Sequence, residues 1–293
     1  MYSKDNFTYG AELEFADVLL GQELPFGNQW NKKDFAIINS NGIANDPLGR
    51  TCKYGGEINT KPTNSIEEQV ENFKQILKIL NPKPIVNYSC NLHIHIGISG
   101  LRNDLEMLKK IMTYVYQYGK LAFNLIDSIP IPNKNDYESN EAYGGALKRY
   151  KRRRVSHHYL LPKSRIDKIL FSETIDDFFK NHAVKNKDGR PLFHLMTRQA
   201  INLFQLYNET ETIEFRHFPQ TLDIEEFKNS LEWCSDFLYE AMTEQKSPEI
   251  LFESKNWKFP KFELYNHKLA LGYKVTSIKY HSRKEIMEYL INQ

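Results

Sequence analysis

Hydrophobic and polar residues alternate along several short segments, and a period of two predicts strands with one buried face. The predicted strands cover residues 9–16, 54–60, 87–99, 200–207 and 212–218. The last two are expected to form a hairpin across residues 208–211. The clearest alternation lies in 87–99, whose apolar face would carry Leu92, Ile94, Ile96 and Ile98.

Three longer segments carry apolar residues every three or four positions, which predicts amphipathic helices over 65–80, 104–118 and 223–244. Ser65 and Glu68 have the spacing of a capping box at the start of the first helix. Asp223 and Glu226 are expected to cap the third, whose inward side chains would be Phe227, Leu231, Cys234, Leu238 and Ala241. A short helix is also predicted near residues 283–291.

Groups of strands separated by helices favour an α+β fold with a mostly antiparallel sheet. With 293 residues, of which 41% are hydrophobic, the chain can bury a substantial core. No internal repeat or low-complexity linker divides it. We therefore expect residues 1–293 to form a single domain.

Charge is balanced overall but concentrated in one place. The net charge of +2 gives no general attraction to nucleic acid or membranes. The run 148–154 is strongly basic, and it lies in a polar, turn-rich excursion at about 130–160. This run could grip ATP phosphates or an acidic substrate, bind a polynucleotide, or form a solvated loop. A steep loss of affinity with salt would identify a polyanionic partner.

The cysteines and the chain start indicate a cytoplasmic protein. Cys52, Cys90 and Cys234 are widely spaced, so they predict neither a disulfide framework nor a zinc ribbon, and Cys90 is expected to pack in the core. Residues 1–10 are polar and lack the apolar core of a signal peptide. No apolar run has the roughly 20 residues that span a bilayer, so we expect no membrane association.

The polar faces of the predicted strands carry side chains of the kind that bind metals. Side chains two apart on a strand point the same way. Shared faces are therefore expected for Glu12 with Glu14, Glu57 with Asn59, His93 with His95, and Glu214 with Arg216.

Crowded carboxylates repel one another unless a cation compensates them. Mg²⁺ or Mn²⁺ would do so, and Arg216 could bind a phosphoryl group. Each pair has a simpler reading when taken alone: a solvated acidic face, a structural histidine network or a cross-strand ion pair. Their combination on strands of matching polarity favours a metal site that handles an anionic, phosphate-bearing substrate.

Four short motifs follow one another along the chain: 10–15 (GAELEF), 55–60 (GGEINT), 91–97 (NLHIHIG) and 212–216 (TIEFR). Together, and in this order, they resemble the amidoligase family of the carboxylate–amine ligase superfamily, which includes glutamine synthetase and glutamate–cysteine ligase. The resemblance implies a glutamine synthetase-like catalytic domain, with a curved antiparallel sheet and helices on its convex face. It also implies ATP-dependent amide formation through an acyl phosphate.

The resemblance implies a role for each matched residue. The metal ligands would be Glu12, Glu14, Glu57, His93 and Glu214. His95 would lie near the ATP phosphates, and Arg216 would stabilise the transferring phosphoryl group. Glu57 and Arg216 would therefore be catalytic. Arg198, just ahead of the hairpin, matches no distinct motif but could contact the nucleotide or substrate.

Two other functions use the same residues. A metal-dependent hydrolase or phosphotransferase could employ this Glu/His face without making amides. A catalytically silent module is disfavoured because all the charged motif residues are retained. For the ligase we expect small-molecule or peptide carboxylate and amine substrates, with ATP and Mg²⁺ or Mn²⁺. Nucleic acid is not expected as a partner, and an oligomer is compatible with the sequence.

Overall fold

Within the residues that the computed structural model describes, six antiparallel strands form one sheet. The structure describes residues 2–16, 18–31, 37, 55–84, 86, 90–118, 135, 163–182, 199–207 and 211–243. The strands are β1 (Phe7–Ala16), β2 (Gln29–Asn31), β3 (Gly55–Asn59), β4 (Asn91–Ile98), β5 (Ile201–Asn202) and β6 (Thr212–Pro219). Their order across the sheet is β2-β3-β1-β4-β6-β5.

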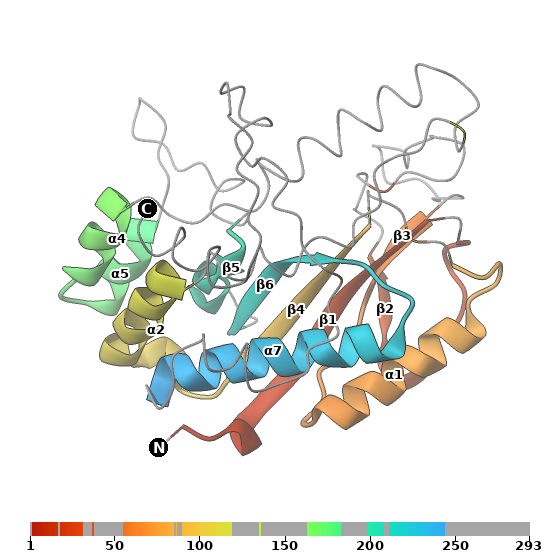
Figure 1. The fold of residues 1–293 in the computed structure, drawn as a ribbon, viewed down its shortest axis with the longest axis horizontal. Coiled ribbons are helices and arrows are strands. Elements are labelled where there is room, and N and C mark those ends of the chain that lie inside the picture. Colours follow the sequence, from red (N-terminus) through yellow and green to blue (C-terminus); the bar gives the residue numbers. More distant parts are fainter. Residues whose placement is uncertain are drawn as a thin grey trace, which may run out of the picture.

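Helices cover one face of this sheet (Figure 1). The α-helices are α1 (Ile66–Ile79), α2 (Leu105–Tyr118), α4 (Lys163–Leu170), α5 (Ile175–His182) and α7 (Ile224–Thr243). Short 3-10 helices are η1 (Lys4–Asn6), η2 (Pro25–Gly27), η3 (Leu101–Asn103) and η6 (Leu203–Tyr207). Helices α1 and α7 run across the sheet, while α4 and α5 lie beyond α2 at one end. The α+β prediction is confirmed.

The core lies between the sheet and these helices. Leu13, Ile94 and Phe215 come from the three central strands and are fully buried, as the alternation predicts. On the helical side, the rings of Phe73 and Phe227 lie 4.2 Å apart, joining α1 to α7. Burying each such side chain stabilises the fold by roughly 1.5–3 kcal/mol. The opposite face of the sheet is thus left to polar side chains.

The helix starts follow the predicted caps. Ser65 accepts a hydrogen bond from the Glu68 backbone N–H at 3.1 Å, and the Glu68 carboxylate accepts one from the Asn64 N–H at 3.1 Å. Asp223 accepts bonds from the backbone of Glu225 and Glu226 at the start of α7. These bonds satisfy donors that the first helical turn leaves unpaired. The residues predicted to face inward on α7 are all buried.

The predicted strand over 200–207 is wrong for most of its length. Only Ile201–Asn202 pair with β6, and η6 follows directly. Asn202 Oδ1 accepts a bond from the Phe204 N–H at 3.0 Å, which turns the chain, and Leu203 and Leu206 are buried in the core. Local side-chain bonding of this kind competes with strand pairing.

Several features were not anticipated, and others lie outside the described residues. Strand β2 and helices α4 and α5 had no predicted counterpart. The basic run 148–154 and the predicted helix near 283–291 are outside the described part of the chain. Among the helices that are described, none is long and apolar enough to cross a membrane.

Candidate functional site

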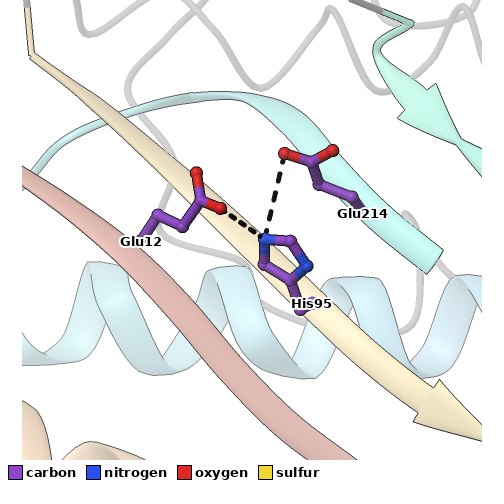
Figure 2. A group of neighbouring side chains, drawn as sticks. All are labelled: Glu12, His95 and Glu214. Carbon is purple, nitrogen blue, oxygen red and sulfur yellow. Dashed lines mark hydrogen bonds and ion pairs between the residues drawn. The ribbon is translucent and has the colours of Figure 1, made fainter. Parts of the chain in front are cut away.

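Five of the predicted site residues meet on the face of the sheet that points away from α7. Glu12 comes from β1, His93 and His95 from β4, and Glu214 and Arg216 from β6. The register places Glu12 opposite His93 and His95 opposite Glu214. Directly opposed residues of an antiparallel pair point to the same side. Figure 2 shows Glu12, His95 and Glu214 converging from three adjacent strands. These five residues are called the Glu-His-Arg cluster below.

Short contacts tie the cluster together. Glu12 Oε2 lies 2.6 Å from His93 Nδ1, and Glu12 Oε1 lies 3.2 Å from His95 Nε2. Glu214 Oε1 lies 3.7 Å from His93 Nδ1 and 3.8 Å from His95 Nε2. It is also bonded to the Arg216 guanidinium. Both carboxylates therefore face the same pair of imidazoles.

The carboxylates of the cluster are held ionised. Burial alone would raise the pKa of Glu12, but hydrogen bonds from His93 and His95 outweigh it and hold the pKa well below its usual value. Burial also acts to raise the pKa of Glu214, which is fully buried, but the charge of Arg216 lowers it. The site therefore contains two carboxylates that stay charged at neutral pH.

The two histidines differ in their protonation. Burial and the charge of Arg216 lower the pKa of His93, which favours the neutral imidazole. For His95 burial acts in the same direction, but the bond to Glu12 and the charge of Glu214 raise its pKa above the ordinary value. His93 is thus set up as a neutral ligand, whereas His95 carries a proton to higher pH.

The donor set suits a divalent cation. One ligand atom from each of Glu12, His95 and Glu214 lies within 4.8 Å of the others. Ligands about 2.1 Å from a Mg²⁺ ion are at most about 4.2 Å apart, and the contacts at 3.2 and 3.8 Å satisfy that limit. In the described part of the chain, the buried Nε2 of His93 has no hydrogen-bond partner. Such an orphaned ring nitrogen favours an additional ligand at the site.

Glu14 and Glu57 form a second acidic pair on the same face. They lie directly opposite each other on β1 and β3. Glu14 accepts bonds from the backbone N–H and side-chain amide of Asn91, at 2.7 and 3.3 Å. Glu57 accepts a bond from the Asn31 amide. Both are buried, and their predicted roles as metal ligands stay predictions.

A glycine on β3 and a β-bulge on β6 explain how the backbone presents these side chains. A Cβ on Gly55 would lie 2.6 Å from the carbonyl oxygen of Phe15, so only glycine lets β3 approach β1 closely here. On β6, Arg216 and His217 together oppose the single residue His93, which is a β-bulge. The bulge sends Arg216 to the cluster, while His217 packs against Trp233 of α7, with ring centroids 5.4 Å apart.

Amide side chains around the cluster were missed in the sequence. Asn202 and Gln205 both donate to Glu214 Oε2, at 3.0 and 3.1 Å. A hairpin closed directly across 208–211 would place Asn202 opposite His217, whereas the structure pairs it with Glu214. The register of β5 against β6 could be predicted only by recognising that η6 follows Asn202. Arg198 lies outside the described residues.

A family model described as "Putative amidoligase enzyme" matches residues 31–238, more than two thirds of the chain. The chain belongs to the amidoligase family. The match includes His93, His95, Glu214 and Arg216 but begins after Glu12. Family membership makes the protein a ligase by class, as the four motifs predicted.

Other comparisons add little to this assignment. No curated protein matches the sequence significantly. Among solved structures, the chain is similar to glutamate–cysteine ligase from Francisella tularensis in complex with AMP. The identity is 12%, the alignment covers 99% of this chain and 78% of that one, and the TM-score is 0.39. A likeness of this size carries no argument about fold or activity.

Proposed function

We propose that this amidoligase family member is an ATP-dependent carboxylate–amine ligase that forms an amide through an acyl phosphate. The observation that carries the proposal is the Glu-His-Arg cluster on the face of the sheet that points away from α7. It combines carboxylate oxygens and imidazole nitrogens, which suit Mg²⁺ or Mn²⁺, with a guanidinium that suits phosphate. The substrates would be ATP, a small-molecule or peptide carboxylate, and an amine.

The metal would be held by Glu12, His93 and Glu214, with Glu14 available on the same strand as Glu12 and Glu57 on β3. His95 has a ligand atom within 4.8 Å of those of Glu12 and Glu214, so it would join them once it loses its proton. When bound, a divalent cation would neutralise charge on the phosphate oxygens. Arg216 has a buried Nε–H without a hydrogen-bond partner in the described part of the chain. This donor is available to a phosphoryl oxygen, which supports the predicted role of Arg216 at the γ-phosphate.

The proposed reaction has two steps. A carboxylate oxygen of the acid attacks the γ-phosphorus of ATP, the bond from phosphorus to the bridging oxygen breaks, and ADP leaves. The amine nitrogen then attacks the acyl carbon of the acyl phosphate, the carbon–oxygen bond breaks, and phosphate leaves while the nitrogen loses a proton. Positioning and charge stabilisation are the main demands of the first step, and exclusion of water protects the acyl phosphate.

Arg198 would contact the nucleotide or the substrate. The proposed setting is the reducing cytoplasm. Among the described cysteines, both Cys90 and Cys234 are buried, and Cys234 is a free thiol, which agrees with that setting.

The test is ADP release with Mg²⁺ or Mn²⁺ against a panel of amino acids, peptides and polyamines. Release that requires both an acid and an amine supports the ligase. Turnover of a substrate without ATP would instead identify the hydrolase. Product mass should equal acid plus amine minus one water, with one ADP and one phosphate released per amide formed.

Glu12→Gln provides the site variant, because Glu12 keeps a quarter of its side chain exposed and its loss leaves Glu214 paired with Arg216. Glu71→Gln makes the same chemical change on the outer surface of α1, where Glu71 is exposed. Activity should disappear in the first variant and persist in the second. Normal turnover of the true substrates by Glu12→Gln would refute the site assignment.

A further inference from the structure

The two oxygens of the Glu214 carboxylate have different partners. Oε2 accepts hydrogen bonds from Asn202 Nδ2 at 3.0 Å and from Gln205 Nε2 at 3.1 Å. Oε1 faces Arg216 and both histidines of the cluster. Because Glu214 is fully buried, rotation of the carboxylate would have to break the bonds to both amides. The amides therefore hold the carboxylate in an orientation that turns a single oxygen toward the cluster.

The orientation of the Asn202 amide is set from two sides. A carboxylate only accepts hydrogen bonds, so the group facing Glu214 must be the NH₂. The other end, Oδ1, accepts the bond from the Phe204 N–H that begins η6. Three residues further along the chain, Gln205 reaches the same carboxylate oxygen. The end of β5 and the first turn of η6 thus each supply one donor to the same carboxylate oxygen.

We infer that Asn202 and Gln205 are positioning residues that hold Oε2 of Glu214, so that Oε1 alone is presented to a divalent cation. This inference rests on the proposed function only in assuming that the cluster binds a metal. The amides act through Glu214, as outer partners of metal ligands commonly do, and losing such a partner typically costs about 10–100-fold in affinity. Glu214 would accordingly act as a monodentate ligand.

Gln205→Met tests the inference because methionine keeps a similar length and removes the donor. Binding of Mn²⁺ alone is measured by the electron paramagnetic resonance of free Mn²⁺ at fixed pH. We expect affinity at least about tenfold weaker than in the wild type. Gln75→Met is the matched control, since Gln75 Nε2 donates to the Glu71 carboxylate at 2.7 Å on the exposed surface of α1. Its Mn²⁺ affinity should equal that of the wild type.

Asn202→Ser is the second variant and is measured alongside Gln205→Met. If Gln205→Met does not fold, Asn202→Ser tests the inference in its place. A serine hydroxyl can still accept the bond from the Phe204 N–H but is too short to replace the donor to Glu214. Weakened Mn²⁺ binding in folded variants, with Gln75→Met unchanged, supports the inference. Wild-type affinity in a folded variant that lacks its donor to Glu214 would overturn it and leave the proposed ligase untouched. A wild-type protein that binds no Mn²⁺ would overturn both.

Discussion

His217→Phe should change how the stability of the protein depends on pH. His217 is 2% exposed, and its ring packs against Phe218 and Trp233, with centroids 4.1 and 5.4 Å away. Burial lowers the pKa of His217 from 6.5 to about 3, although the 3.4 Å contact of Nδ1 with the Ala200 carbonyl acts to raise it. Phenylalanine keeps an aromatic ring at this position and removes the titrating group.

The sign follows from proton linkage. Below pH 6.5 the unfolded chain protonates His217 while the folded protein does not, so acid favours the unfolded state until the pH reaches about 3. Each unit between the two pKa values contributes about 1.36 kcal/mol, so His217 should cost the wild type about 2 kcal/mol between pH 7 and pH 5. The variant should lack this loss.

Urea unfolding at pH 7 and pH 5 measures the effect. The change between the two pH values is compared within each protein, so any constant packing cost of the larger ring cancels. The other buried groups titrate equally in both proteins. If the wild type and His217→Phe lost the same free energy of unfolding on acidification, His217 would not be held neutral in the core.

Three further predictions address the site and the scaffold. Glu12→Gln should lower turnover by about 100-fold, measured as ADP release, because the charged carboxylate that faces both histidines is lost. Mn²⁺ affinity should rise about tenfold per pH unit until the pH exceeds the raised pKa of His95, because the metal must displace the His95 proton. Calorimetry at several pH values would measure the Mn²⁺ affinity, and an affinity that does not change with pH would contradict the prediction. Ser65→Ala should reduce the free energy of unfolding by about 1 kcal/mol without altering Mn²⁺ binding, because only the cap of α1 is lost.

Local patterns predicted the parts of the fold that depend on local forces. The alternation over 87–99 identified both faces of β4, because a strand buried on one side must alternate. Helix α1 followed from its cap and its apolar spacing. The length of β5 and its register with β6 could not be predicted, because the turn at Asn202 depends on a bond from the Phe204 N–H and on the burial of Leu203. Neither feature repeats with the period of a strand or a helix.

The site was predictable as a set of residues but not as a set of contacts. Period two placed His93 and His95 on one face, and the register then brought Glu12 and Glu214 to them. The opposite directions of Arg216 and His217 depend on a bulge that simple alternation does not include. The amides of Asn202 and Gln205 depend on η6, so they were beyond any argument from strand pattern.

The geometry also changes why a metal is expected. Crowded carboxylates taken alone favour a divalent cation, but Arg216 already pairs with Glu214, and the raised pKa of His95 favours its positively charged form beside Glu12. A cation that binds there must therefore displace the proton of His95 wherever it is present, and it must compete with Arg216 for Glu214 Oε1. Displacement would free the guanidinium to contact a phosphoryl group. Metal binding and phosphate binding would then be coupled through Glu214, so each should strengthen the other.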